Sequence, residues 1–558
     1  QNPFDSDVIY YCTGEGAGNS AGIPGQGVFK STDGGNTFSQ LSATDNKKFD
    51  YCWKIAHSRT VNDVVVVTTD EYGIWRTTDG GASWTKVLVT KKEVNDLIAL
   101  PNGDFFATLK NDGIFHSTDD GATWTEVTNG LPASGFGRIA IAFSENHPNT
   151  MYAAYAQSND VLLGIYKSTD GGTSWALTNA QPFHLLSLTW YCFFIGVSAT
   201  NPDHVVFGAQ YLRHSLNGGD SWNNSTGGHA DYHCYADDPA NPGHFLLGND
   251  GGVYRREWAD MYGLIDDLND GYHVTQFYAG DYFPSGNSVM AGTQDNGTHR
   301  ALNLGWAKVN GADGGYSQVS LQDSNLGYLE EQEGRIHRCT TLQSSFMYAI
   351  PIYSQITSVD LTRFIAPFEI NRADGDQVYF CSRGRIWRTT NQGNDWNPIT
   401  NYHYTIYGVG VTKDVDPTVY FGGNSAKIYR IDNATSATAG DEVDLSNTVP
   451  SAITHHAISD IKPHPTDNTK AYVTFSSTDP EGRVWRVDNI HTSAPTWVDI
   501  SGNLPSKLPC NSMEVLPSND QSLYVGTDFG LYCSTNGGST WSKETGIPNV
   551  AVHQVQLR

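Results

Sequence analysis

One short pattern recurs seven times along the chain and limits the folds that it can adopt. Each copy, which we call a box, reads Ser/Thr-x-Asp/Asn-x-Gly-x-x-aromatic, and the central residues are Asp33, Asp79, Asp119, Asp170, Asn217, Asn391 and Asn536. The carboxylate or amide accepts backbone N–H groups in an Asx-turn, the glycine adopts positive φ, and the aromatic ring packs back on a sheet. The pattern therefore predicts a tight hairpin at each box, and we expect all seven boxes to be structural.

The spacing of the boxes predicts the architecture. The first five centres lie 40 to 51 residues apart. Five degenerate copies occupy the longer gaps: Gly252–Arg255, Gly297–Arg300, Gly334–Arg338, Ile428–Arg430 and Val484–Arg486. Units of roughly 45 residues have the length of a four-stranded propeller blade. The sequence therefore predicts an all-β protein with about twelve four-stranded blades.

The number of units favours two rings over one, because ordinary propellers have roughly four to eight blades. We expect two β-propellers of six or seven blades each, with a boundary in the irregular segment Glu257–Tyr272, so that residues 1–262 form the first and 263–550 the second. The chain opens with the second strand of a blade and closes with an inner strand. We therefore expect residues 551–558 to pair with the first blade and remove its exposed edge.

Charge and hydropathy exclude several classes of function. The formal net charge is −25 and only 17% of residues are charged. Such a chain repels phosphate backbones and anionic lipid, so we expect neither nucleic-acid binding nor membrane insertion. The longest apolar stretch, Leu185–Val197, is too short for a spanning helix. The chain begins at Gln1 without a basic and apolar leader, which predicts a secreted or cell-surface protein whose signal peptide has been removed.

The boxes resemble the Asp-boxes, or bacterial neuraminidase repeats, of sialidases, of the ten-bladed sortilin propeller and of two-propeller xyloglucan-active glycoside hydrolases. Other stretches are similar to large secreted bacterial proteins of the sortilin/xyloglucanase-like type: His229–His233 with Gly248–Gly252, Ala291–Gly297 and Gly311–Tyr316. The resemblance implies a β-propeller fold. It leaves the function open, because Asp-boxes lie at outer hairpins away from the ligand-binding face.

The resemblance also indicates candidate catalytic residues. A sialidase usually carries a Phe-Arg-Ile-Pro segment, which this sequence lacks. A xyloglucanase-like hydrolase needs two carboxylates flanking a cleft between propellers. Asp50 lies in a place similar to the first carboxylate, and Asp295 and Asp250 both resemble the second. The alternative at each position is an aspartate that satisfies its own turn.

Candidate ligand-binding residues are His229, Asp231 and His233, which strand alternation places on one face, and the aromatic residues Trp53 and Trp190, which can stack on sugar rings. The His/Asp/His set either binds a transition metal or hydrogen-bonds within a channel. The sequence requires no cofactor, but the acidic loop from Asp266 to Gly271 offers oxygen ligands for Ca²⁺.

Two functions follow from these observations. The first is a non-catalytic secreted or cell-surface protein that binds an extracellular polysaccharide or protein partner, and it is favoured because no catalytic motif is complete. The alternative is a glycoside hydrolase that uses paired aspartates in a cleft between propellers. A sortilin-like peptide receptor fits less well, because twelve blades do not suit a ring of ten.

Overall fold

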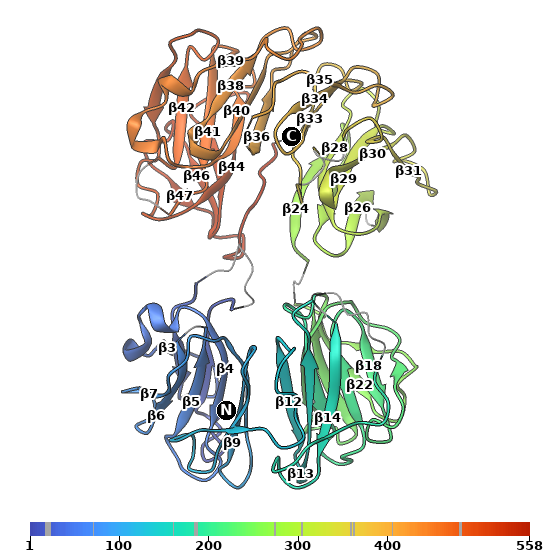
Figure 1. Cartoon of the computed structure of the whole chain (residues 1–558). Coiled ribbons are helices and arrows are strands. Elements are labelled where there is room, and N and C mark those ends of the chain that lie inside the picture. The colour runs from blue at the N-terminus through green and yellow to red at the C-terminus, as the bar shows by residue number, and fades with distance from the viewer. Residues whose placement is uncertain are drawn as a thin grey trace. The chain divides into compact units, whose positions relative to one another are not determined.

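The computed structural model describes residues 1–16, 24–70, 72–159, 161–182, 188–272, 275–302, 305–357, 360, 363–403, 405–478 and 482–557. The chain is an all-β protein, and its strands form twelve antiparallel sheets in sequence order (Figure 1). Eleven sheets have four strands and one has three. Across the described ranges, the helical elements are six short 3-10 turns. No helix in this part of the chain is long and apolar enough to cross a membrane. The predicted β-propeller fold, with its twelve blades, is therefore confirmed.

The chain folds into two compact units, and the first comprises Gln1–Val274 with six sheets. Its elements are β1 (Ile9–Cys12), β2 (Val28–Ser31), β3 (Ser39–Gln40), η1 (Ser42–Thr44), η2 (Lys47–Phe49), β4 (Cys52–His57), β5 (Val65–Thr69), β6 (Gly73–Thr77), β7 (Thr85–Leu88), β8 (Val94–Ala99), β9 (Phe105–Leu109), β10 (Gly113–Ser117), β11 (Thr125–Val127), β12 (Ile139–Ser144), β13 (His147–Ala156), β14 (Leu162–Ser168), β15 (Ala176–Leu177), β16 (Phe194–Val197), β17 (Val205–Gly208), β18 (Leu212–Ser215), β19 (Asn223–Asn224), β20 (Tyr232–Asp237), β21 (His244–Asn249), β22 (Gly252–Glu257) and β23 (Asp266–Asp267).

The second unit comprises Thr275–Arg558 and also contains six sheets. Its elements are β24 (Phe277–Tyr282), β25 (Val289–Thr293), β26 (Gly297–Leu302), β27 (Gly305–Asn310), β28 (Gly314–Val319), β29 (Gly327–Glu331), η3 (Gln332–Gly334), β30 (Arg335–Cys339), β31 (Ala349–Pro351), β32 (Phe368–Ile370), β33 (Val378–Cys381), β34 (Ile386–Thr389), β35 (Asn397–Pro398), β36 (Ile406–Val411), β37 (Val419–Gly423), η4 (Asn424–Ala426), β38 (Ile428–Ile431), β39 (Val443–Asp444), η5 (Ser446–Thr448), η6 (Ser451–Ile453), β40 (Ile458–Pro463), β41 (Lys470–Phe475), β42 (Val484–Asp488), β43 (Thr496–Asp499), β44 (Cys510–Val515), β45 (Leu523–Thr527), β46 (Gly530–Ser534) and β47 (Ser542–Lys543).

The second strand of each blade explains why these segments become strands. β5 is the run Val-Val-Val-Thr-Thr, and all five of its residues are buried. β-Branched residues suit a strand that is covered on both faces. The core lies between neighbouring blades: Val66 and Ile74 of one blade pack with Leu97 and Phe105 of the next. Each blade therefore depends on its neighbour for burial, as repeat architectures do.

The first strand of each blade is the inner strand, because it contacts the first strands of the neighbouring blades. This contact links β4, β8, β12, β16 and β20 in the first unit and β24, β28, β32, β36, β40 and β44 in the second. These strands surround the axis of their unit, so their side chains line a central channel.

The boxes form the predicted turns. Each lies between the third and fourth strands of its blade, or between β2 and β3 in the three-stranded sheet. In every box the N–H four residues after the central residue donates to its side-chain oxygen at 2.8–3.0 Å. The glycine two residues after each centre has positive φ, between 79° and 101°. The box turns therefore stabilise the outer edges of the blades.

The C-terminal tail does not complete the first blade, and this prediction was wrong. Residues 551–557 lie outside the strands, and their hydrogen bonds reach residues of the second unit. The Val555 N–H donates to Ser512 Oγ of β44, and the Gly280 N–H of β24 donates to Gln554 Oε1. The tail thus lies between the last and first inner strands of its own unit, where two polar backbone edges need partners.

The end of the first unit also differs from the expected boundary after residue 262. β23 pairs with β22, so the outer strand of the sixth blade is Asp266–Asp267. The first unit consequently extends to Val274. The irregular segment contains this short strand, which its sequence pattern did not distinguish from a linker.

Candidate functional site

A β-bulge near the start of several inner strands turns one side chain away from the regular ladder. In the first unit the register shifts between Cys52 and Lys54, between Val94 and Asp96, and between Tyr232 and Cys234. The extra residues are Trp53, Asn95 and His233. A bulge leaves its extra residue unpaired and redirects the side chain, which is why bulges occur beside functional sites.

Arg138 connects the Trp53 bulge to the loop that precedes β16. Its guanidinium carbon lies 5.3 Å from the centroid of the Trp53 ring. Its Nη1 donates to the carbonyl oxygens of Thr189, Trp190 and Tyr191 at 3.3, 3.1 and 2.9 Å. Burial lowers the pKa of this guanidinium. The arginine thus fixes the loop that presents two aromatic rings.

Those two rings extend the site toward the His233 bulge. The Trp190 and Tyr191 ring centroids are 5.5 Å apart, and Trp190 remains 38% exposed. Tyr191 meets the His233 ring edge-on at 4.7 Å, and His233 Nε2 lies 2.6 Å from Asp250 Oδ1. The arrangement offers an exposed aromatic surface beside an imidazole and a carboxylate.

Asp231 adds a second carboxylate to this region. Carboxylate oxygens of Asp231 and Asp250 lie within 4.8 Å of each other. Burial raises the pKa of Asp231, and the charge of Asp250 raises it further. The Cys192 thiol donates to Asp231 Oδ1 at 3.5 Å, and Asp231 has a φ of 60°. Burial and the neighbouring carboxylate thus both disfavour the charged form of Asp231.

The first-unit site, as we call it, consists of Trp53, Arg138, Trp190, Tyr191, His233, Asp231 and Asp250. It includes four of the five residues predicted to bind ligand and one of the three predicted catalytic aspartates. Sequence reasoning missed Arg138. The available signal was its position immediately before an inner strand, whereas most other arginines occupy the third strand of a blade.

The other three predicted residues, His229, Asp50 and Asp295, take part in local contacts. His229 Nδ1 is 3.2 Å from the carbonyl oxygen of its neighbour Ala230. Asp50 follows the turn η2, and its backbone carbonyl accepts from the Gly25 N–H. Asp295 belongs to the second unit, where it occupies a turn with φ 60° and its N–H donates to Asp313 Oδ1. The roles proposed for Asp50 and Asp295 in catalysis stay predictions.

The acidic loop that could bind Ca²⁺ already uses its oxygens in part. Asp266 Oδ2 accepts from the Arg255 guanidinium, and Asp267 Oδ1 accepts from the backbone and the side chain of Asn269. These contacts supply a structural role for the two carboxylates. Calcium binding stays a prediction, as does any metal at the His/Asp/His set.

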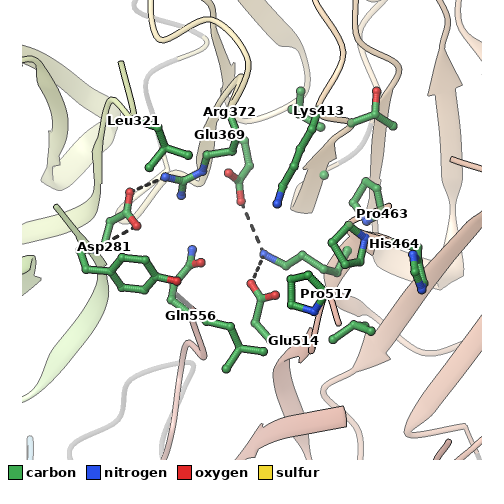
Figure 2. A pocket seen from close by; sticks show the side chains of 18 of the residues that line it. Asp281, Leu321, Glu369, Arg372, Lys413, Pro463, His464, Glu514, Pro517 and Gln556 are labelled. Atoms are coloured by element: carbon green, nitrogen blue, oxygen red, sulfur yellow. Dashed lines mark hydrogen bonds and ion pairs between the residues drawn. The ribbon is translucent and has the colours of Figure 1, made fainter. Parts of the chain in front are cut away.

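The second unit has a cavity of about 320 Å³ at one end of its channel, and most charges there are paired with one another (Figure 2). Arg372 Nη1 lies 2.7 Å from Asp281 Oδ2, and the Lys462 ammonium lies 3.0 Å from Glu514 and 3.9 Å from Glu369. Both cations have raised pKa values despite burial, because the neighbouring carboxylates stabilise the charged forms. This network joins inner strands of different blades and has a structural explanation.

Comparison with known proteins gives the class of the fold. The family described as "DUF6242 beta propeller domain" matches residues 26–182. By sequence the chain matches no curated protein. The chain is thus a β-propeller protein.

Solved structures with the same fold cover nearly the whole chain. A GH74 xyloglucanase from Xanthomonas campestris superposes with a TM-score of 0.68 at 17% identity, covering 98% of this chain and 85% of the other. A GH74 enzyme from Niastella koreensis gives 0.65 at 15% identity, covering 97% and 84%. PorZ of Porphyromonas gingivalis, described as an essential bacterial surface component of the type-IX secretion system, gives 0.50 at 12% identity, covering 93% and 72%. At these identities the likeness concerns the fold.

Proposed function

We propose that this protein is a secreted or cell-surface β-propeller protein that binds an extracellular glycan at the first-unit site. The observation that carries the proposal is the exposed Trp190 ring beside Tyr191, next to the His233–Asp250 pair. Aromatic faces stack on the apolar faces of sugars, and a few fixed polar groups orient a ligand. The boxes, as turns on the outer edges of the blades, support their assignment as Asp-boxes of the sortilin/xyloglucanase-like type.

The experiment measures binding to soluble polysaccharides by affinity electrophoresis and then determines Kd by calorimetry with the best ligand. Trp190→Ala is expected to weaken binding at least ~10-fold, because a truncated aromatic anchor commonly costs more than ~1.4 kcal/mol. Trp306→Ala is the matched control, since Trp306 is also an exposed tryptophan but lies on β27 of the second unit. Equal Kd values for both variants and the parent protein would remove the support for this site.

A second candidate function is glycoside hydrolysis, which the Asp231–Asp250 pair favours. A carboxyl group whose pKa is raised by burial and by a neighbouring carboxylate, as at Asp231, is the kind of group that can serve as an acid. The fold is similar to that of a GH74 xyloglucanase and of a second GH74 enzyme. A reducing-end assay on a polysaccharide panel tests this function. Release that is abolished by Asp250→Asn, Asp231→Asn or Asp295→Ala supports hydrolysis, whereas binding without release supports the binding function alone.

A further inference from the structure

The second unit has another cavity, at the end of its channel opposite the paired charges of Figure 2. It has a volume of about 410 Å³, and the bulged residues of four inner strands line it: Tyr278, Tyr407, Ser459 and Asn511. Tyr316, from the bulged region of β28, and His553 of the tail also face it. β-Bulges near the starts of inner strands therefore contribute to this cavity as they do to the first-unit site.

Arg363 brings a cation into this cavity, and it forms no ion pair with a carboxylate of the described chain. Its Nη1 is buried, and no hydrogen-bond partner for it exists within the described ranges. The guanidinium carbon lies 4.7 Å from the centroid of the Tyr407 ring. A buried charged donor without a partner is costly, so such groups in native structures call for an explanation.

No carboxylate within the described ranges forms an ion pair with Arg363, and Glu330 interacts with it only through its charge. Glu330 is fully buried, and its Oε1 accepts from the N–H groups of Gly334 and Ala366. Burial raises the pKa of Glu330 well above its ordinary value. At the opposite end of the channel, by contrast, Arg372 and Lys462 both contact carboxylates. The cavity at Arg363 thus presents a guanidinium group that has no ion-pair partner in the described chain.

The other groups that line the cavity indicate which kind of ligand it can bind. The Tyr316 and Tyr407 hydroxyls form no hydrogen bond among the residues that the structure describes, and Asn511 uses only its amide nitrogen, toward Asp528 and Val552. The Asn511 Oδ1 and the His553 ring therefore remain available for hydroxyl groups. Tyrosine rings beside these polar groups suit the mixed surface of a sugar.

We propose that this cavity, the Arg363 pocket, binds the carboxylate of an acidic sugar. The guanidinium receives the planar carboxylate in a charge-assisted pair, and the tyrosine rings and Asn511 contact the sugar ring and its hydroxyl groups. This pocket is built from residues of the second unit and does not depend on the proposed function.

The test titrates the full chain with D-glucuronate and with its methyl ester, which is the same sugar without the charge, and follows both by ligand-observed NMR. Glucuronate is expected to bind at least ~10-fold more tightly than the ester, the effect of a hydrogen-bonded charge. Arg363→Met is expected to abolish this difference and Arg363→Lys to retain part of it. The matched control is Arg383→Met, since the exposed Arg383 side chain makes no hydrogen bond in the described chain.

Three results would overturn the proposal. One is equal binding of glucuronate and its ester, and another is a charge preference that survives Arg363→Met. The third is tighter binding of acetyl-glycylglycine than of glucuronate, which would assign the pocket to a peptide carboxylate. Thermal unfolding shows whether a loss of binding comes from a folding defect. The Tm of Arg363→Met is expected to stay unchanged or to rise, because the substitution removes an unpaired buried charge.

Discussion

The box turn shows how single residues fix the outer edge of a blade. In four boxes an aspartate accepts from a backbone N–H and from a hydroxyl, and its negative charge is stabilised by both, so its pKa falls below the ordinary value. In the other three an asparagine keeps the oxygen acceptor and donates from its amide instead, as Asn217 does to Ser221. The two chemistries give the same backbone turn. Only the aspartate makes that turn sensitive to acid.

The first prediction concerns this difference at Asp170, whose pKa is lowered to about 2, chiefly by the Ser174 hydroxyl. A depressed folded-state pKa contributes stability above the unfolded pKa of ~4, and that contribution is lost as the pH falls toward 2. The Tm of Asp170→Asn is therefore expected to decrease less between pH 4 and pH 2 than the Tm of the parent protein. Asp170→Ala is expected to lower the Tm by ~2–4 °C at pH 7, because the turn loses its acceptor.

The reverse substitution, in another box, is the control for this prediction. Asn217→Asp places a titratable acceptor in a box that lacks one, so its Tm should fall more steeply in acid than that of the parent. Identical pH profiles for the parent, Asp170→Asn and Asn217→Asp would contradict the account of the box charge.

At the scale of elements, the repeat predicted the blades, but it did not predict the β-bulges in the inner strands or the contacts of Arg138. Seven boxes and five degenerate copies were enough to predict twelve blades, because a local pattern determines each hairpin. The bulges at Trp53 and His233 have no such local signature, since a bulge is defined by the partner strand. Arg138 was missed for a similar reason: its acceptors lie about fifty residues away in sequence.

The tail is the element whose position the sequence predicted incorrectly. Its alternation suggested an inner strand, but alternation does not specify which edge the strand will meet. The structure places it against β44 and β24, where Gln554 accepts from the Gly280 N–H. The long-range choice between two exposed edges depends on the whole fold and cannot be read from seven residues.

The second prediction tests the position of the C-terminal tail by adding one methyl group beneath it, at Gly526. A Cβ added at Gly526 would lie 2.6 Å from the Val552 carbonyl oxygen, so Gly526→Ala is expected to displace the tail and cost ~1–3 kcal/mol of unfolding free energy. Hydrogen exchange should increase in β24 and β44. Gly546→Ala is the control, because a Cβ there meets nothing within 4 Å. Unchanged exchange in both inner strands would show that the tail does not protect them.

At the scale of the molecule, polar residues line the channel of each unit, and the box turns lie at the outer edges of the blades. Bulged inner strands place Trp53 and His233 in the first unit and Tyr278 and Tyr407 in the second. The repeats thus supply the scaffold, and the irregularities within the inner strands supply the chemistry. This division explains why the fold was predictable from a recurring pattern and why the ligand was not.

The location of the glycan is the most direct test of this account. A crystal structure of the full chain with its tightest-binding oligosaccharide is expected to show a sugar ring stacked on Trp190, with hydroxyl groups near His233 and Asp250. A sugar bound at the box turns on the outer edges, with the Trp190 face unoccupied, would contradict it.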